Sequence, residues 1–297
     1  MIQGKIIKGI AGFYYVKANE TIYECSARGK FRNQDVSLLI GDNVEIEIEH
    51  KESLRGEYKT ASIEKVLARR NKMVRPPVAN VDQAIIVFSV NYPKPNLELL
   101  DQLLILVQEQ GIEPCICINK VDTDNDEGYR MIEEIYAKIG YTVIPTSATN
   151  HRGIDLLKDY LKDKTSFFVG NSGVGKSTLL NAVQPSLALQ TGSLSEKINR
   201  GKHTTRHVEL MPLAIGGYVL DTPGFSSVST EHIEASDLKD YYKEFYAYEG
   251  TCKFVGCAHI HEPRCGVKEA VASGEINSRR YEGYVTLYNQ LKDIRRW

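Results

Sequence analysis

The stretch FFVGNSGVGKSTLLN, Phe167 to Asn181, decides the fold of the central part of the chain. Within it, GNSGVGKS has the spacing G-x-x-x-x-G-K-S/T of a phosphate-binding loop (P-loop). The run TSFFV before the loop predicts a buried strand, and STLLNAV after it predicts a helix. Glycines let backbone N–H groups turn towards phosphate oxygens, and the helix N-terminus adds a favourable dipole. We therefore expect a nucleotide here, with Lys176 on its β- and γ-phosphates and the Ser177 hydroxyl on Mg²⁺.

Length and composition limit the class of protein. The chain has 297 residues, of which 42% are hydrophobic and 25% charged, as in soluble globular proteins of about two domains. No apolar run approaches the ~18 residues of a membrane span, and the start of the chain lacks the features of a signal peptide. We expect a cytoplasmic location and no membrane partner. The net charge of −1 argues against a protein that coats nucleic acid by bulk electrostatics.

A second motif indicates which nucleotide is bound. The apolar stretch CICI runs into Asn119-Lys120-Val121-Asp122, the pattern N-K-x-D. The Asp122 carboxylate can accept hydrogen bonds from N1–H and the exocyclic amine of guanine, whereas adenine offers neither donor there. The Lys120 stem would pack over the base. Another expected strand ends in Thr146-Ser147-Ala148, which resembles the second base-contacting loop of GTPases. These loops together predict guanine recognition.

The segments after the P-loop predict a Mg²⁺ site and a switch. VLDTPG ends another expected strand, so that Asp221 would hold Mg²⁺ through water and the Gly224 N–H would meet the γ-phosphate. Between the P-loop helix and this strand lies a polar segment with two adjacent threonines, Thr204 and Thr205. One of them would complete the Mg²⁺ sphere in the triphosphate state and order the segment. Taken alone, the segment also fits a plain surface loop.

The order of these motifs is unusual. The chain presents the base loop, the second base loop, the P-loop, the switch and the Mg²⁺ aspartate, whereas ordinary GTPases place the last three first. All five motifs are present but cyclically shifted, which predicts a circularly permuted α/β domain. Such a rearrangement is tolerable because the old termini of a compact domain often lie close together. The GTPase domain would begin near Val78, with VDQAIIVFSV as its first strand.

The residues that we expect to bind GTP come from all of these motifs. They are Asn119, Lys120, Asp122, Ser147, Ala148, Gly170, Asn171, Ser172, Gly173, Val174, Gly175, Lys176, Ser177, Thr178, Asp221 and Gly224. The residues expected to hold Mg²⁺ are Ser177, Thr204, Thr205 and Asp221.

The residue that would orient the attacking water differs from the one that Ras-like enzymes use. Ras-like enzymes use a glutamine just after the D-x-x-G motif, but the residue at that position is Phe225, which cannot orient water. His203, beside the switch threonines in GKHTTRH, is the candidate. Lys176 and Thr205 complete the expected catalytic set. The alternative to a GTP-hydrolysing enzyme is an RNA-binding assembly factor that uses GTP mainly as a structural ligand.

Residues 1–70 predict a small β-barrel. Short alternating stretches such as ETIYECSARG and DNVEIEIE, separated by turns, are typical of an OB-fold. The run from Arg55 to Arg75 carries seven basic residues against two acidic ones, and Phe13, Tyr14, Tyr15 and Phe31 precede it. These features fit an RNA-binding face, although strand aromatics are usually core and charge runs usually solvated. RPPVANVD would be the linker to the GTPase domain.

A cysteine and histidine cluster follows the GTPase motifs. CKFVGCAHIHEPRC places Cys252, Cys257 and Cys265 with His259 and His261 within fourteen residues. Three thiolates and one imidazole suit a closed tetrahedral zinc site, and His259 and His261 compete for the place of the imidazole ligand. Zinc would supply folding energy to a segment too small for its own core. The alternatives are buried cysteines or the thiol pair of a metal-dependent redox protein.

The end of the chain has helical spacing. An apolar stripe would pack on the GTPase domain; it consists of Tyr281, Tyr284, Leu287, Tyr288 and Leu291. Four arginines would then face solvent or RNA, namely Arg279, Arg280, Arg295 and Arg296.

These motifs together resemble one family over essentially the whole chain. The permuted order, GNSGVGKST, GKHTTRH, DTPGF and the cysteine cluster are similar to those of the RsgA (YjeQ or YloQ) family of small ribosomal subunit-dependent GTPases. The resemblance implies three domains: an all-β OB-fold at 1–70, a circularly permuted α/β P-loop GTPase domain at 71–230, and a mainly helical zinc-binding domain at 231–297.

The resemblance also implies a function and a ligand set. It implies hydrolysis of GTP to GDP, stimulated by the small (30S) ribosomal subunit during late maturation, with contact to its rRNA. It implies one structural zinc held by Cys252, Cys257, His259 and Cys265, and Arg264 stands where a glycine is common in the family pattern. We further expect a monomer.

Overall fold

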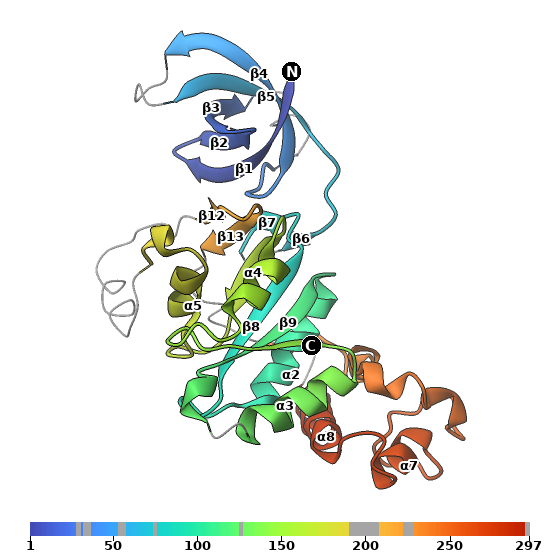
Figure 1. Cartoon of the computed structure of the whole chain (residues 1–297). Helices are drawn as coiled ribbons and strands as arrows, with labels where there is room; N and C mark the ends of the chain where they lie inside the picture. The colour runs from blue at the N-terminus through green and yellow to red at the C-terminus, as the bar shows by residue number, and fades with distance from the viewer. Residues whose placement is uncertain are drawn as a thin grey trace.

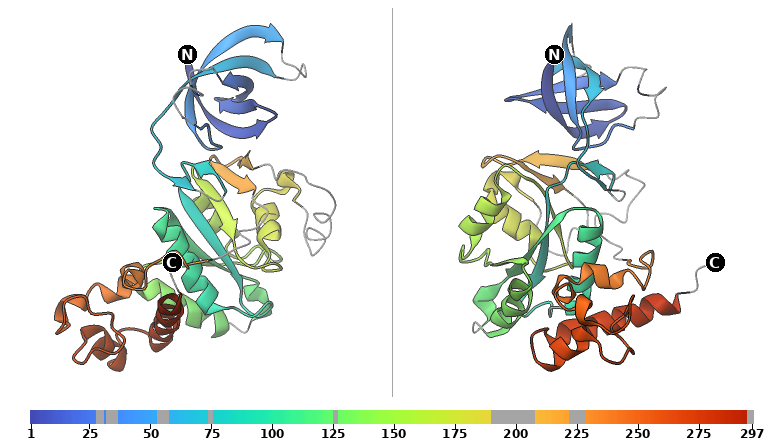
Figure 2. Two further views of the ribbon diagram at one scale, coloured as in Figure 1. Left: turned by 180° about the vertical axis from the view of Figure 1, so that it is seen from behind. Right: turned by 90° about the vertical axis from the view of Figure 1, so that its right-hand side faces the viewer.

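The chain folds into a barrel, a central sheet and a helical region in that order (Figure 1). The computed structural model describes residues 1–27, 31, 37–52, 58–73, 76–124, 127–189, 208–221 and 229–294; side chains are not described for 50–52, 127 and 221. The barrel and the helical region lie at opposite ends of the molecule, with the central sheet between them (Figure 2).

The N-terminal barrel is built from β1 (Ile2–Ile10), β2 (Phe13–Ala18), β3 (Thr21–Ala27), β4 (Asn43–Glu52) and β5 (Lys59–Val66). Neighbouring strands pair in the order β1-β2-β3-β5-β4, and β1 also pairs with β4, which closes the barrel. Ile6, Val16, Cys25 and Ile63 form its interior. Phe31 is buried in the same interior, whereas Tyr15 is buried in the core cluster of the central domain, so neither aromatic is free on the barrel surface. The barrel is the OB-like domain that the alternating strands predict.

The barrel is fixed to the central sheet by several contacts, among them a strand pairing and the connecting segment; Ile7 and Tyr15 of the barrel also lie in the core cluster of the central domain. β1 pairs with β12 (Glu209–Pro212), where Lys8 lies opposite Glu209 and the two side chains form an ion pair of 2.8 Å. The connecting segment contains β6 (Lys72–Met73) and β7 (Val78–Ala79) and runs between the two domains. Buried Asn80 donates from Nδ2 to the carbonyl oxygen of Gly41 at 3.0 Å. The expected linker thus packs tightly against the barrel.

The central sheet has the strand order β10-β9-β8-β11-β13-β12. Its members are β8 (Gln83–Ser89), β9 (Glu113–Asn119), β10 (Thr142–Pro145), β11 (Thr165–Val169) and β13 (Tyr218–Asp221), all parallel, with β12 antiparallel at the side of β13. Parallel strands bring their carboxyl ends to one edge of a sheet. The loops that follow β9, β10 and β11 therefore share an edge, although β11 comes last of the three in the chain.

Helices cover both faces of this sheet. α2 (Leu97–Glu109) and α3 (Glu127–Lys138) cover one face, and α4 (Ile154–Leu161) and α5 (Lys176–Val183) the other. The alternating side chains of β8 point to the two faces: Ile86 and Phe88 pack in the core under α2 and α3, and Ile85 and Val87 pack in the core under α4 and α5. Because both faces of β8 are covered, the strand contains a continuous apolar run. None of the helices in the described ranges combines the length and apolar character needed to cross a membrane.

The C-terminal region has its own buried core. Its elements are the 3₁₀ helices η4 (Leu238–Tyr241), η5 (Lys243–Phe245) and η6 (Glu249–Thr251), followed by α7 (Gly266–Ala272) and α8 (Ser278–Asp293). Tyr242, Phe245, Tyr284 and Leu287 pack together there with Ile105 of α2. The short cysteine and histidine segment thus shares a core that is built mainly from residues outside it. The α8 stripe, expected on the GTPase domain, lies largely within this local core and meets that domain at Ile105.

Arg280 also corrects the sequence analysis, which expected it to face solvent or RNA. Its side chain is 3% exposed and forms ion pairs with Asp101 of α2 and, at 2.7 Å, with Glu244 of η5. The Tyr136 hydroxyl of α3 donates to Asp101 at 2.7 Å, and the guanidinium lies 4.5 Å from the ring centroid of Tyr242. Charged side chains of α8, α2 and η5 thus form one buried network, which joins the C-terminal region to the GTPase domain.

Arg280→Met tests this network. The substitution leaves the Asp101 and Glu244 carboxylates buried without their cation, so we expect a loss of about 3–5 kcal/mol in stability. Arg279→Met is the matched control, because Arg279 is the exposed neighbour on the same helix and should change stability by less than about 0.5 kcal/mol. Urea unfolding followed by circular dichroism measures both. Equal effects of the two substitutions would contradict a stabilising role for the network.

Candidate nucleotide site and metal centre

The P-loop joins β11 to α5 at the carboxyl edge of the sheet, and its glycines are required by geometry. Gly170 has φ +143°, and a Cβ placed on it would lie 2.2 Å from the carbonyl oxygen of Val87. Gly175 has φ +97°, and a Cβ there would lie 2.3 Å from Nδ2 of Asn119. A side chain at either position would collide with the neighbouring strand end. The loop therefore keeps its N–H groups close to the sheet edge only because these residues are glycine.

Lys176 is the first residue of α5 and reaches back across the loop. Its Nζ donates to the carbonyl oxygens of Gly170 at 2.7 Å and Asn171 at 2.8 Å. Burial lowers the pKa of Lys176, because carbonyl dipoles replace only part of the hydration of the ammonium group. A phosphate would supply the anionic partner that this cation lacks among the described residues. Ser177 is half-buried and Thr178 exposed in the same first turn, so the donor set fits a nucleotide phosphate chain.

The N-K-x-D loop contacts the P-loop directly. Asn119 is buried and donates from Nδ2 to the carbonyl oxygen of Val174 at 2.8 Å. Lys120 adopts the left-handed conformation, and its Nζ donates to Gly173 at 2.8 Å and to the carbonyl of Tyr92 at 2.7 Å. The Lys120 side chain therefore spans the P-loop and the loop after β8. Exposed Asp122 lies one turn further on, in the 3₁₀ helix η1 (Val121–Thr123).

The second base loop is bound to the first. The Thr146 hydroxyl donates to Oδ1 of Asn119 at 3.3 Å, and the backbone N–H of Val121 donates to the carbonyl of Thr146 at 3.2 Å. Ser147 is buried and Ala148 half-buried directly after it. The loops that follow β9, β10 and β11 therefore form one hydrogen-bonded unit, which brings together the expected base residues and the expected phosphate residues.

Several expected site residues lie outside the described part of the chain. These are the candidate water-orienting His203, the switch threonines Thr204 and Thr205, and Gly224; Phe225 lies there too. Asp221 ends β13 at the same sheet edge, but its side chain is not described. Ser177 is thus the one expected Mg²⁺ ligand whose side chain the described structure places.

Two contributors to this site were missed in the sequence. Thr146 belongs to the motif T-S-A but was assigned no role, although its hydroxyl joins the two base loops. The loop after β8 holds Lys120 through the Tyr92 carbonyl, and the Ser89 hydroxyl shapes the loop by donating to the carbonyl of Pro93 at 2.6 Å. Backbone acceptors carry no residue-type signal, so no pattern in the sequence pointed to this loop.

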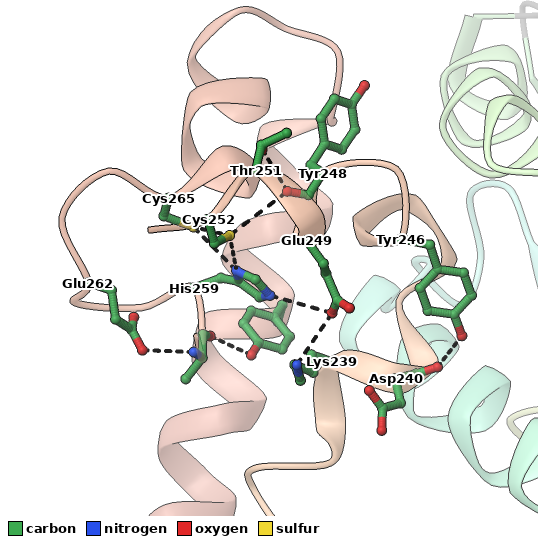
Figure 3. A network of polar contacts seen from close by, with 12 residues as sticks. Lys239, Asp240, Tyr246, Tyr248, Glu249, Thr251, Cys252, His259, Glu262 and Cys265 are labelled. Carbon is green, nitrogen blue, oxygen red and sulfur yellow. Dashed lines mark hydrogen bonds and ion pairs between the residues drawn. The ribbon is translucent and has the colours of Figure 1, made fainter. Parts of the chain in front are cut away.

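The cysteine and histidine cluster forms a compact set of ligand atoms. One atom from each of Cys252, Cys257, His259 and Cys265 lies within 4.8 Å of every other. Nδ1 of His259 is 3.2 Å from Sγ of Cys265 and 3.6 Å from Sγ of Cys252, and the two sulfurs are 3.8 Å apart (Figure 3). Sulfur ligands about 2.3 Å from a tetrahedral zinc lie at such mutual distances. His261 is exposed and not part of the cluster, so the four residues present fit zinc.

The loop that carries His259 is shaped by the Glu262 carboxylate. It accepts from the backbone N–H groups of Ala258 at 2.7 Å, Ile260 at 3.0 Å and His261 at 3.1 Å. Partial burial raises the pKa of Glu262, but these donors outweigh burial and hold the pKa below its ordinary value. Arg264 has φ +55°, a conformation that glycine adopts at lower cost, so the turn keeps a glycine-like shape despite the arginine.

The electrostatics of the cluster favour a bound cation. Burial raises the pKa of Cys257 to about 12, so this thiol ionises at neutral pH only if a positive charge offsets its desolvation. Burial also lowers the pKa of His259, which keeps its imidazole neutral and available as a ligand. These shifts suit a metal site better than a reactive thiol pair, which requires thiols of lowered pKa.

Comparison with protein families identifies two segments of the chain. Residues 66–231 match the model described as RsgA GTPase, and residues 3–53 match the model described as RsgA N-terminal domain. The chain is similar to the "Small ribosomal subunit biogenesis GTPase RsgA" of Caldanaerobacter subterraneus subsp. tengcongensis, with 48% identity over 98% of this chain and 96% of that protein. The protein of the same name from Alkaliphilus metalliredigens is 46% identical over the full length of both.

Solved structures agree along the whole chain. The crystal structure of YjeQ from Thermotoga maritima superposes with a TM-score of 0.83 at 37% identity, covering 99% of each chain. The crystal structure of YloQ, described as a circularly permuted GTPase, superposes with a TM-score of 0.82 at 37% identity, covering 100% of this chain and 97% of that one. With the permuted strand order, the OB-like barrel and the cysteine and histidine cluster, these matches show that the chain belongs to the RsgA GTPase family.

Proposed function

We propose that this protein hydrolyses GTP to GDP and phosphate on the small (30S) ribosomal subunit, during late maturation of that subunit. The observation that carries the proposal is the joining of the guanine motif to the P-loop, through Asn119 to Val174 and Lys120 to Gly173. The name of the full-length relatives, small ribosomal subunit biogenesis GTPase, supports the ribosomal partner. The cytoplasm is the location that accords with such a partner.

Each part of the site has a proposed role in GTP binding. The P-loop N–H groups from Gly170 to Thr178 and the Lys176 ammonium would hold the phosphates, with Gly224 at the γ-phosphate. Asp122, with Ser147 and Ala148, would select guanine. The residues proposed to hold Mg²⁺ are Ser177, Asp221 and one of Thr204 and Thr205. Mg²⁺, when bound, neutralises negative charge on the β- and γ-phosphates.

We propose that hydrolysis is slow until the small subunit is bound. Phe225 stands where Ras-like enzymes have a water-orienting glutamine, so another group must orient the water. His203 would do this once a partner orders the switch, with Thr205 and Lys176 stabilising the transferring phosphoryl group. The same Phe225 favours the second candidate, an RNA-binding assembly factor in which GTP is only a structural ligand.

The flanking domains would supply contacts and stability. We propose domain limits of 1–70, 71–230 and 231–297, with rRNA contact by the barrel, a monomeric chain and one structural zinc in the C-terminal domain. Cys252, Cys257, His259 and Cys265 would hold that zinc, as their compact arrangement supports. Four protein ligands leave no open position, so the metal would stabilise the loop and take no part in hydrolysis.

GTP turnover with and without purified small ribosomal subunits is the decisive test. We expect the subunits to accelerate hydrolysis strongly, and His203→Ala to lower the stimulated rate by about 10²- to 10⁴-fold while GTP still binds. Single-turnover release of phosphate measures both. Acceleration that survives His203→Ala would contradict the role of His203. Tight GTP binding with no acceleration would support the assembly factor that uses GTP as a structural ligand.

Asp122→Asn tests the guanine contact. Each hydrogen bond to a charged acceptor contributes about 1.5–3 kcal/mol, so losing the carboxylate should weaken GTP binding at least about tenfold. The new amide donor would face the C2 carbonyl of xanthine, so xanthosine triphosphate should bind better than it does to the unaltered protein. Asp155→Asn, on the exposed side of α4, is the control and should change neither affinity. Unchanged GTP binding by Asp122→Asn would refute base recognition by this loop.

His259→Ala and His261→Ala form a matched pair for the zinc site. We expect one zinc per chain in the unaltered protein, its loss in His259→Ala, and its retention in His261→Ala, because only His259 lies in the cluster. Metal analysis after gel filtration measures the stoichiometry. Guanine nucleotide affinity should be the same in all three proteins. Loss of zinc in His261→Ala alone would show that the competing histidine is the ligand.

A further inference from the structure

The metal cluster has a carboxylate behind its histidine. While Nδ1 of His259 faces the cysteine sulfurs, Nε2 on the far side of the ring lies 3.6 Å from Oε1 of Glu249 (Figure 3). Both atoms are buried, and neither has a hydrogen-bond partner among the described residues. An imidazole nitrogen and a carboxylate oxygen that are buried side by side, with no nearer partner, are complementary if the nitrogen carries a proton.

Glu249 is held in this place by its own surroundings. It lies in η6, which ends one residue before Cys252, so the chain carries it directly into the cluster. Nζ of Lys239, in η4, lies 3.6 Å from the same Oε1 atom. The other nearby carboxylate, Glu262, is occupied by three backbone N–H groups of the loop. Among the described residues, Glu249 is thus the carboxylate that faces the free ring nitrogen of His259.

We propose that Glu249 is a positioning residue for the metal centre: its carboxylate accepts the Nε2–H of His259 and so directs the Nδ1 lone pair towards the three thiols. The proposal rests on the proposed zinc site. Neutral imidazole carries one N–H, and its hydrogen bond determines which nitrogen is free to bind a metal. The opposite tautomer would point a proton at the metal position and a lone pair at the carboxylate. Lys239 holds the carboxylate in turn.

The contact needs only a small movement to become a hydrogen bond. At 3.6 Å the two atoms are about 0.8 Å beyond the length of an ordinary charge-assisted N–H···O bond. The ring itself is confined, because Phe245 packs edge-on against it with centroids 5.5 Å apart and an interplanar angle of 74°. The Tyr281 hydroxyl also donates to the His259 carbonyl at 2.6 Å. Because the backbone and ring face of His259 are held, the gap would be closed by a small shift of the Glu249 carboxylate, which η6 and Lys239 keep beside the ring.

Zinc affinity of the full-length protein tests the proposal, measured by competition with a chromophoric chelator. We expect Glu249→Ala to weaken zinc binding about 10- to 100-fold, the range for loss of a partner behind a ligand. Glu249→Gln keeps an acceptor oxygen without the charge and should lose less. Glu282→Gln, on the exposed surface of α8, is the control and should bind zinc as the unaltered protein does. Guanine nucleotide affinity should be the same in every variant.

Absorption of the Co²⁺-substituted proteins separates positioning from a general structural role. We expect Glu249→Gln to keep the tetrahedral thiolate bands, since all four ligands remain, but to lose Co²⁺ at lower chelator concentration. If Glu249→Ala fails to fold, Glu249→Gln still tests the proposal. Zinc binding in the unaltered protein with unchanged affinity in both variants overturns the role of Glu249. Absence of zinc from the unaltered protein overturns the zinc site itself.

Discussion

The hydrogen bonds from Asn119 to Val174 and from Lys120 to Gly173 join the two halves of the nucleotide site. In this permuted chain the base-recognition half comes first and the phosphate half second, so residues more than fifty positions apart must meet. The sheet makes this possible, because β8 lies between β9 and β11 and all three are parallel. The order of motifs along the chain therefore matters little, provided that each motif follows a strand that ends at the same edge.

The permutation does change what lies next to the switch segments. β12 follows the segment with Thr204 and Thr205, and it pairs with β1 of the barrel through Lys8 and Glu209. The chain after the D-x-x-G motif enters the C-terminal region, where His232 contacts Glu109 of α2 at 2.8 Å. Ile233 packs beside it with Ile105. Each segment expected to respond to the γ-phosphate is thus adjacent in the chain to residues that contact another domain: β12 contacts the barrel, and His232 and Ile233 of the C-terminal region contact α2 of the GTPase domain.

The sequence predicted these features unequally, for physical reasons. Gly170 and Gly175 could be recognised because a phosphate loop requires particular residues at a fixed local spacing. The barrel could be predicted because the alternation of apolar and polar residues within each strand is also a local pattern. The burial of Arg280 could not be predicted, because an arginine on a helix is usually solvated. Its partners Glu244 and Asp101 lie 36 and 179 residues away in the sequence. No local sequence pattern predicts the contact between Glu249 and His259 either. That contact depends on how η6 packs against the loop from Cys252 to Cys265.

The structure also changes the role that a metal would play in the C-terminal domain. A segment without a core would depend on zinc for folding, as small zinc fingers do. This domain instead buries Tyr242, Phe245 and Tyr284 against α2, and the Tyr284 hydroxyl holds the metal loop by donating to the Ala258 carbonyl at 2.6 Å. The apolar core already positions the helices, so the metal would mainly fix the loop from Cys252 to Cys265. Metal binding would then stabilise mainly the local geometry of this loop. A carboxylate behind a ligand, such as Glu249, has its greatest effect on that geometry.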